Sequence, residues 1–139
     1  MTREQIIALL PHGEGMCLLD TVESVDENSI TCSATIHNDH PLRHNGEVSG
    51  IIALEYGAQA IGLWAALRHG AENKPKEGYV LALRNFKLHD RALPQNALLT
   101  ITADKKLLGE DSAICLFAVA SEKNVIAEGQ ITLKTGPTS

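Results

Sequence analysis

The hydrophobic pattern is dominated by one stretch, Val48 to His69, which would be apolar on nearly every face if it formed a helix. A helix that is hydrophobic all round must be enclosed by the rest of the protein. Ser49 is a good N-cap residue, and Gly50 after it is expected to leave the first backbone N–H groups of the helix open to a ligand. The remainder of the chain is therefore expected to fold around this helix.

Shorter patterns on both sides predict one small helix and several strands. Thr2 and Gln5 have the spacing of a capping box, ahead of a short amphipathic helix that Pro11 ends. Apolar and polar residues alternate from Ile30 to Ile36, which is typical of a half-buried strand. Further extended runs are expected at about 16–25, 79–89, 98–106, 113–120 and 125–133, with turns at 26–28, 94–96, 109–111 and 122–124.

The order of these elements predicts an α+β fold. The last three strands are joined by short turns and should form an antiparallel meander. One curved antiparallel sheet of five to six strands, wrapped around one long central helix, accounts for the whole pattern, with residues 1–139 as a single domain. Because one curved sheet covers only part of such a helix, we expect a homodimer.

Composition and charge narrow the class of protein. The chain has 44% hydrophobic and 21% charged residues, as expected for an ordinary globular domain. Its net charge of −5 argues against nucleic acid as the main partner, because phosphate binding depends on clustered Lys and Arg. An acidic partner would need a local basic patch, for which the candidates are Arg43, Arg68, Lys74, Lys76, Arg84, Lys87 and Arg91.

The cysteines and the N-terminus favour the cytoplasm. Cys17, Cys32 and Cys115 lie singly in apolar runs without C-x-x-C spacing, and an odd count gives no disulfide framework. They are interpreted as buried thiols of a reducing compartment. In residues 1–11 the apolar run before the proline is only five residues long, so this segment is expected to be neither a secretory signal nor a membrane span.

The candidate chemistry lies in the long helix and the loop before it. Glu55 is the one charged residue between Glu47 and Arg68, and a carboxylate in apolar surroundings is costly unless it is paired or protonated. The polar loop from Asn38 to Glu47 brings histidines to the start of the helix. These histidines, His40 and His44, stand four apart in a proline-containing segment, which is a poor arrangement for a metal site.

These residues resemble a known family, the hot-dog-fold 3-hydroxyacyl-acyl-carrier-protein dehydratases of the FabZ/FabA type. The segment L-P-H-G-E-G-M-C-L-L-D at 10–20 is similar to their L-P-H-x-x-P-x-L-L-x-D motif. The segment G-I-I-A-L-E-Y-G-A-Q at 50–59 is similar to their G-V-L-x-x-E-A-x-A-Q motif. The loop departs from their G-H-F-P-G pattern, and H-P-L-R together with E-Y-G-A-Q-A resembles the ApeP dehydratases of aryl polyene biosynthesis.

The resemblance implies a reaction without metal or organic cofactor. A 3-hydroxyacyl thioester on acyl carrier protein would become the trans-2-enoyl thioester, with His40 taking the α-proton and Glu55 protonating the departing hydroxide. Burial would favour the neutral form of Glu55. The N–H groups of Gly50 and Ile51 would stabilise charge on the thioester oxygen.

Several alternatives remain open at this stage. His44 is the alternative base, and Glu55 could instead be a structural carboxylate. Gln59 is either a polar group that orients substrate or a core amide with its hydrogen bonds satisfied, whereas Tyr56 and Trp64 are interpreted as packing residues. The same fold could also serve as an acyl thioesterase, or as a non-catalytic hot-dog subunit that supports a partner dehydratase.

Overall fold

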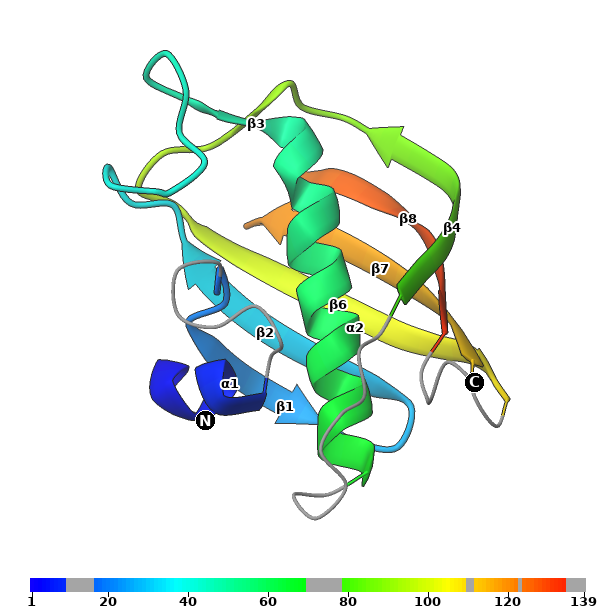
Figure 1. The fold of residues 1–139 in the computed structure, drawn as a ribbon. Helices are drawn as coiled ribbons and strands as arrows, with labels where there is room; N and C mark the ends of the chain where they lie inside the picture. The colour runs from blue at the N-terminus through cyan, green and yellow to red at the C-terminus, as the bar shows by residue number, and fades with distance from the viewer. Residues whose placement is uncertain (10–16, 70–78, 110–111, 123, 135–139) are drawn as a thin grey trace.

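The long helix α2 (Ala53–His69) lies against one face of a curved antiparallel sheet (Figure 1). The computed structural model describes residues 1–9, 17–69, 79–109, 112–122 and 124–134. The six strands of this sheet are β1 (Thr21–Val25), β2 (Ser29–Thr35), β4 (Tyr79–Leu88), β6 (Leu98–Leu108), β7 (Ser112–Ser121) and β8 (Asn124–Lys134). The predicted α+β fold, with one sheet wrapped around one central helix, is confirmed.

The sheet has the strand order β1-β2-β6-β7-β8-β4, and neighbouring strands are antiparallel. The predicted meander is β6-β7-β8. Ile30, Cys32, Ala34 and Ile36 are all almost completely buried, as the alternating pattern predicts, but Ser33 is buried as well, with its hydroxyl bonded to Thr21 and Glu23 of β1. The strand that follows α2 pairs with β8 at one edge, so β1 and β4 form the two edges of the sheet.

Close packing holds α2 on the sheet. A Cβ atom placed on Gly57 would come within 2.4 Å of the Phe117 ring, so the absence of a side chain allows β7 to approach the helix. Phe117 in turn stacks with Phe86 of β4, with ring centroids 6.3 Å apart. Further along α2, the indole Nε1 of Trp64 donates a hydrogen bond to the backbone oxygen of Asp26 (3.1 Å), which ties the helix to the β1–β2 turn.

The N-terminal helix α1 (Arg3–Leu9) has the predicted capping box. The backbone N–H of Gln5 donates to Thr2 Oγ1 (3.3 Å), and the backbone N–H of Thr2 donates to Gln5 Oε1 (2.9 Å). Arg3 then donates from Nη2 to the backbone oxygen of Cys17 (2.9 Å). The helix end expected at Pro11 lies outside the described residues.

The start of the central helix differs from the prediction. Val48 and Ser49 form the short strand β3, which pairs with β5 (Ala92–Leu93) in a separate two-stranded sheet. The chain then makes a 3-10 turn, η2 (Gly50–Ile52), before α2 begins. Ser49 is the N-cap of this 3-10 turn and not of α2 itself, and its Oγ accepts a hydrogen bond from Ile51 N–H (3.3 Å). Pairing with a segment some forty residues later has no local sequence signal, so β3 and β5 were not predicted.

One face of α2 is less covered than the others. Between Ala53 and Leu67, the half-buried positions are Leu54, Glu55, Ala58, Gly62, Ala65 and Leu67, and the other positions are buried. Among the described residues, no helix or strand lies over the exposed side of α2 in the view of Figure 1. The stretch Gly50–Leu67 is long and apolar enough to cross a membrane by length and composition alone, but 56% of it is buried inside the fold, as in a core helix.

Candidate functional site

The histidine-bearing loop is built from consecutive tight turns. Asn45 and Gly46 both have positive φ angles (51° and 83°), and they form a two-residue turn between His44 and Glu47, whose backbones exchange hydrogen bonds of 2.8 and 3.1 Å. Asn-Gly is the pair that such a turn favours. The guanidinium of Arg43 closes the loop by donating to the backbone oxygens of Gly46 and His37. The loop therefore has a defined shape.

His40 is the loop histidine that contacts the central helix. Its Nε2 lies 3.0 Å from the hydroxyl oxygen of Tyr56, and the two ring centroids are 6.2 Å apart. The other ring nitrogen, Nδ1, accepts a hydrogen bond of 3.0 Å from the backbone N–H of Leu42. Tyr56 is only 1% exposed, and it lies in the first turn of α2 next to Glu55. The structure thus joins the loop to the helix through a polar contact at the edge of the core.

The surroundings of this pair favour neutral side chains. Burial lowers the pKa of His40, and the positive charge of Arg43 lowers it further, while Asp39 has the opposite effect. Burial likewise raises the pKa of the Tyr56 hydroxyl far above its usual value. His40 is therefore an uncharged imidazole at neutral pH, which is the form that a general base requires.

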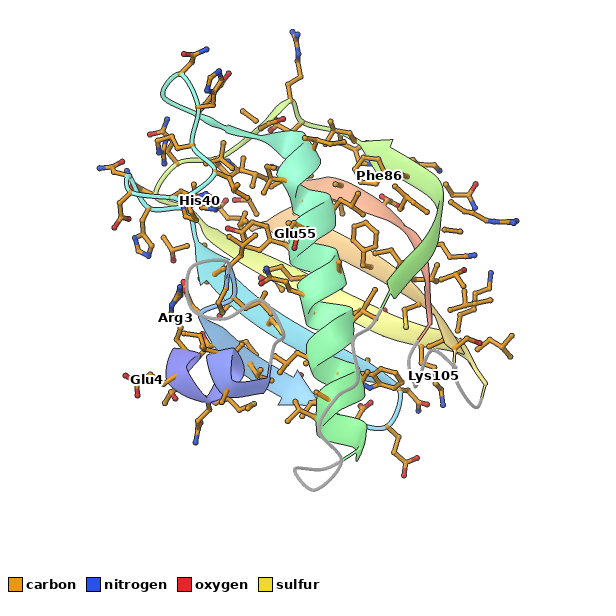
Figure 2. All side chains as sticks on the ribbon, viewed as in Figure 1. Arg3, Glu4, His40, Glu55, Phe86 and Lys105 are labelled. Carbon is orange, nitrogen blue, oxygen red and sulfur yellow. The ribbon has the colours of Figure 1, made fainter. Side chains whose placement is uncertain are left out.

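Glu55 lies on a different side of the helix from Tyr56. Adjacent positions of an α-helix are separated by about 100° around the axis. Figure 2 shows Glu55 on the face of α2 that is turned toward the viewer, while His40 lies to one side of the helix. Glu55 is half-buried and belongs to the incompletely covered face described above. Among the described residues, His40 makes its side-chain contact on the helix with Tyr56.

The predicted oxyanion donors are already engaged. The backbone N–H of Gly50 donates to the carbonyl oxygen of Arg91 (2.8 Å), and that of Ile51 donates to Ser49 Oγ. The expectation that these two N–H groups are open to a ligand is wrong, because the β3–β5 pairing and the N-cap use them. The close approach that Gly50 permits is also intramolecular, since a Cβ atom there would lie 2.1 Å from the backbone oxygen of Asp90.

Gln59 lies in the core. It is 2% exposed, and its Oε1 accepts a hydrogen bond from the backbone N–H of Leu18 (2.9 Å). This position agrees with the core-amide interpretation, in which Gln59 anchors the segment that leads into β1. A role in orienting substrate stays a prediction.

The other residues predicted for the site or the basic patch do not take part in the His40–Tyr56 contact. His44 is exposed, and its backbone is held in the Asn45-Gly46 turn. The guanidinium of Arg43 bonds to the backbone oxygens of Gly46 and His37, and its part in a basic patch stays a prediction. Arg84, Lys87 and Arg91 are exposed, whereas the side chains of Arg68, Lys74 and Lys76 lie outside the described part of the chain.

The three cysteines are buried free thiols, as predicted. No group of three or more His, Cys, Asp or Glu within the described ranges could hold a metal ion.

Sequence reasoning assigned Tyr56 to packing and missed its contact with His40. One general signal was present: a tyrosine in a buried helix usually finds a hydrogen-bond partner for its hydroxyl. The sequence could not name that partner, because the loop reaches the helix only through the tertiary fold.

Comparisons with known proteins agree with this architecture. The family model described as ApeP-like, ApeP dehydratase, matches residues 4–137. No curated protein matches the chain. Among solved structures, the chain is similar to the dehydratase heterocomplex ApeI:P from Xenorhabdus doucetiae, with a TM-score of 0.88 and 24% identity over 99% of this chain and 93% of that chain.

Two further solved structures are more distant. A single-residue mutant of the thioesterase PA1618 from Pseudomonas aeruginosa has a TM-score of 0.71 and 18% identity over 99% of this chain and 95% of that chain. The PaaI protein from the phenylacetic acid degradation operon of E. coli has a TM-score of 0.64 and 13% identity over 82% of this chain and 81% of that chain. At these identities the likeness establishes the hot-dog fold and leaves the reaction open.

Proposed function

Since the chain belongs to the ApeP-like family of dehydratases, we propose that it takes part in the dehydration of a 3-hydroxyacyl thioester carried on acyl carrier protein. The observation that carries the proposal is the neutral, half-buried imidazole of His40, held at the first turn of the same helix that bears Glu55. A neutral imidazole is a suitable base for a weakly acidic α-proton. A carboxyl group on the partly covered helix face is a suitable acid for the 3-hydroxyl.

The proposed reaction moves two protons. His40 takes the α-proton, and the electron pair of the C–H bond remains on the substrate as an enolate. The enolate then expels the 3-hydroxyl, which leaves as water with the proton of Glu55. Exchange with solvent returns both side chains to their starting states. The products are the trans-2-enoyl thioester and one water molecule.

A second subunit is part of the proposal. His40 faces Tyr56, and Glu55 lies on the face of α2 that no described helix or strand covers in Figure 1. A substrate that contacts Glu55 would therefore be enclosed by another protein surface. We propose that this surface is a second hot-dog subunit, either a copy of this chain or a different one, and that its loop histidine comes within substrate reach of Glu55.

One observation favours a second candidate, a non-catalytic subunit of a hetero-oligomer. Both ring nitrogens of His40 are engaged, so its lone pair is not open to substrate in this state. The related ApeI:P structure is itself described as a dehydratase heterocomplex. In this alternative the chain would bind the acyl group or stabilise the partner, and the partner would supply the chemistry.

The test is a product assay with the chain alone and with a second hot-dog subunit. A 3-hydroxyacyl thioester is offered on acyl carrier protein, and the enoyl product and any free thiol are measured. We expect enoyl product, with a loss of about 100-fold or more in the Glu55→Gln and His40→Gln variants. His44→Gln is the matched control, since it changes an exposed histidine of the same loop, and it should retain activity.

Each of the other assay results would contradict the proposal in a different way. A Glu55→Gln protein as active as the wild type would refute the assigned role of Glu55. Enoyl product that forms only with the partner, and is unchanged in both the His40→Gln and Glu55→Gln variants, would establish the non-catalytic role. Release of free thiol without enoyl product would indicate a thioesterase.

The acidic carrier would be recognised by local positive charge. Arg84, Lys87 and Arg91 are the exposed members of the predicted patch. Reversing two of these charges should weaken the use of a carrier-bound substrate more than that of the same acyl group on coenzyme A, because electrostatic complementarity acts mainly on encounter with the carrier.

A further inference from the structure

We infer that Tyr56 is a positioning residue for His40, and that its hydroxyl makes Nδ1 the ring nitrogen that accepts the proton in the proposed reaction. The second part of this inference rests on the proposed function. The assignment comes from the two hydrogen bonds of the imidazole and from the rigidity of the elements that make them.

The hydrogen bonds define the tautomer. A neutral imidazole carries one hydrogen, so one ring nitrogen donates and the other accepts. The backbone N–H of Leu42 can only donate, and it points to Nδ1 at 3.0 Å. Nδ1 must therefore hold the lone pair, and the hydrogen must be on Nε2. The Nε2–H group then donates to the oxygen of Tyr56, 3.0 Å away.

The two partners of the ring differ in how firmly they are held. Tyr56 is almost fully buried on α2, and the next residue of the helix, Gly57, packs directly against Phe117 of the sheet. Leu42 packs against the core, but it belongs to the loop at 38–47, which is held by tight turns and side-chain hydrogen bonds and not by pairing within the sheet. The bond from Nε2 to Tyr56 is thus the fixed anchor, and the bond from Leu42 is the one that a substrate can replace.

This arrangement gives each group a defined part. When the Leu42 N–H is displaced, Nδ1 presents its lone pair and takes the α-proton of the substrate, whose C–H electron pair stays on the substrate. The imidazolium then carries hydrogen on both nitrogens, and Nε2–H remains on Tyr56. Tyr56 touches the far side of the ring, so it acts on the reaction by orienting His40.

The tautomer can be measured without any activity assay. Long-range proton–nitrogen spectra of the full chain, recorded at a pH where the imidazole is neutral, distinguish a lone-pair nitrogen from one that carries hydrogen. The signals of His40 are assigned by their loss in the His40→Gln variant. We expect a lone-pair shift for Nδ1 and an N–H shift for Nε2. The reverse assignment, or two averaged shifts, would overturn the inference.

The Tyr56→Phe variant tests the positioning role. It keeps the ring in the core and removes the one acceptor of Nε2–H, so the two nitrogen shifts should move toward each other. In whichever assembly is active, kcat should fall by about 10-fold with little change in KM, because a misoriented base slows the chemical step more than binding. The matched control is Trp64→Phe, which removes a different hydrogen bond of the same helix and should leave the His40 spectrum unchanged.

Failure of the positioning role of Tyr56 can be distinguished from failure of the proposed dehydratase function. If Tyr56→Phe leaves both the nitrogen shifts and kcat at wild-type values, Tyr56 does not position His40. If the shifts respond in Tyr56→Phe but no assembly of the wild-type chain forms enoyl product, the proposed function fails, the assignment of Nδ1 as proton acceptor fails with it, and the anchoring of His40 by Tyr56 stands.

Discussion

Replacing Gly50 by alanine is expected to destabilise the protein through the junction of β3 and η2. A Cβ atom at this position would lie 2.1 Å from the backbone oxygen of Asp90, 3.0 Å from a methyl carbon of Leu88 and 3.1 Å from the backbone carbon of Arg91. Two of these three neighbours are backbone atoms, which cannot rotate away. An ordinary contact begins at 3.4 Å, so the segment before β5 would have to move by more than an ångström.

The same movement would affect a hydrogen bond. The backbone N–H of Gly50 donates to the carbonyl oxygen of Arg91, and the adjacent Ser49 pairs with Ala92. Overpacking of this kind costs about 1–3 kcal/mol, and a weakened hydrogen bond adds about 1 kcal/mol. We therefore expect Gly50→Ala to lower the free energy of unfolding by roughly 2–4 kcal/mol, which corresponds to a decrease in Tm of about 8–15 °C for a domain of this size.

The assay is thermal and urea unfolding, at equal protein concentrations because oligomers gain stability with concentration. Gly62→Ala is the matched control, since it lies in α2 and a Cβ atom there meets nothing within 4 Å. That variant should be neutral or more stable by up to about 1 kcal/mol, because alanine favours helix over glycine. Equal stabilities of the Gly50→Ala and Gly62→Ala proteins would refute the packing argument.

Three further predictions follow from buried polar groups. Burial lowers the pKa of His40, so the unfolded chain binds a proton at this position as the pH falls below about 6.5, whereas the folded protein binds it only at lower pH. The free energy of unfolding should therefore decrease as the pH is lowered through this range. Urea unfolding of the His40→Gln variant should show less of this pH dependence. Gln59→Leu should lower the free energy of unfolding by about 1–3 kcal/mol, since it leaves the buried N–H of Leu18 without the Oε1 acceptor, and an unchanged urea midpoint would contradict this. Burial raises the pKa of Cys32 to about 12 and of Cys115 to about 11. A thiol reagent at mildly alkaline pH should therefore react slowly with the folded protein, whereas after unfolding it should react readily with all three cysteines.

Much of the fold could be predicted from the sequence because the signals were local. The alternation from Ile30 to Ile36 specified a half-buried strand, and the capping box of Thr2 and Gln5 specified the start of α1. The apolar stretch that ends at His69 indicated a central helix, and Ser49 marked the N-cap of the 3-10 turn that leads into it. Each of these signals depends on residues within one or two turns of one another, where backbone geometry alone determines which side chains share a face.

The site was less accessible for the opposite reason. The sequence brought His40, Glu55 and the start of the helix together as candidates, but it could not show that Gly50 N–H is used by Arg91, forty-one residues later. It also could not show that the His40 ring is held between Tyr56 and the Leu42 backbone.

The sequence by itself determined the central helix, the meander and the family resemblance, which the match over residues 4–137 confirms. The tertiary structure decided which backbone N–H groups are free, which ring nitrogen of His40 carries the hydrogen, and that Glu55 and Tyr56 serve different faces of one helix. The physical reason is that a hydrogen bond is fixed by the positions of both partners, and here one partner lies far away in the chain or on a loop whose path the pattern of residues does not specify.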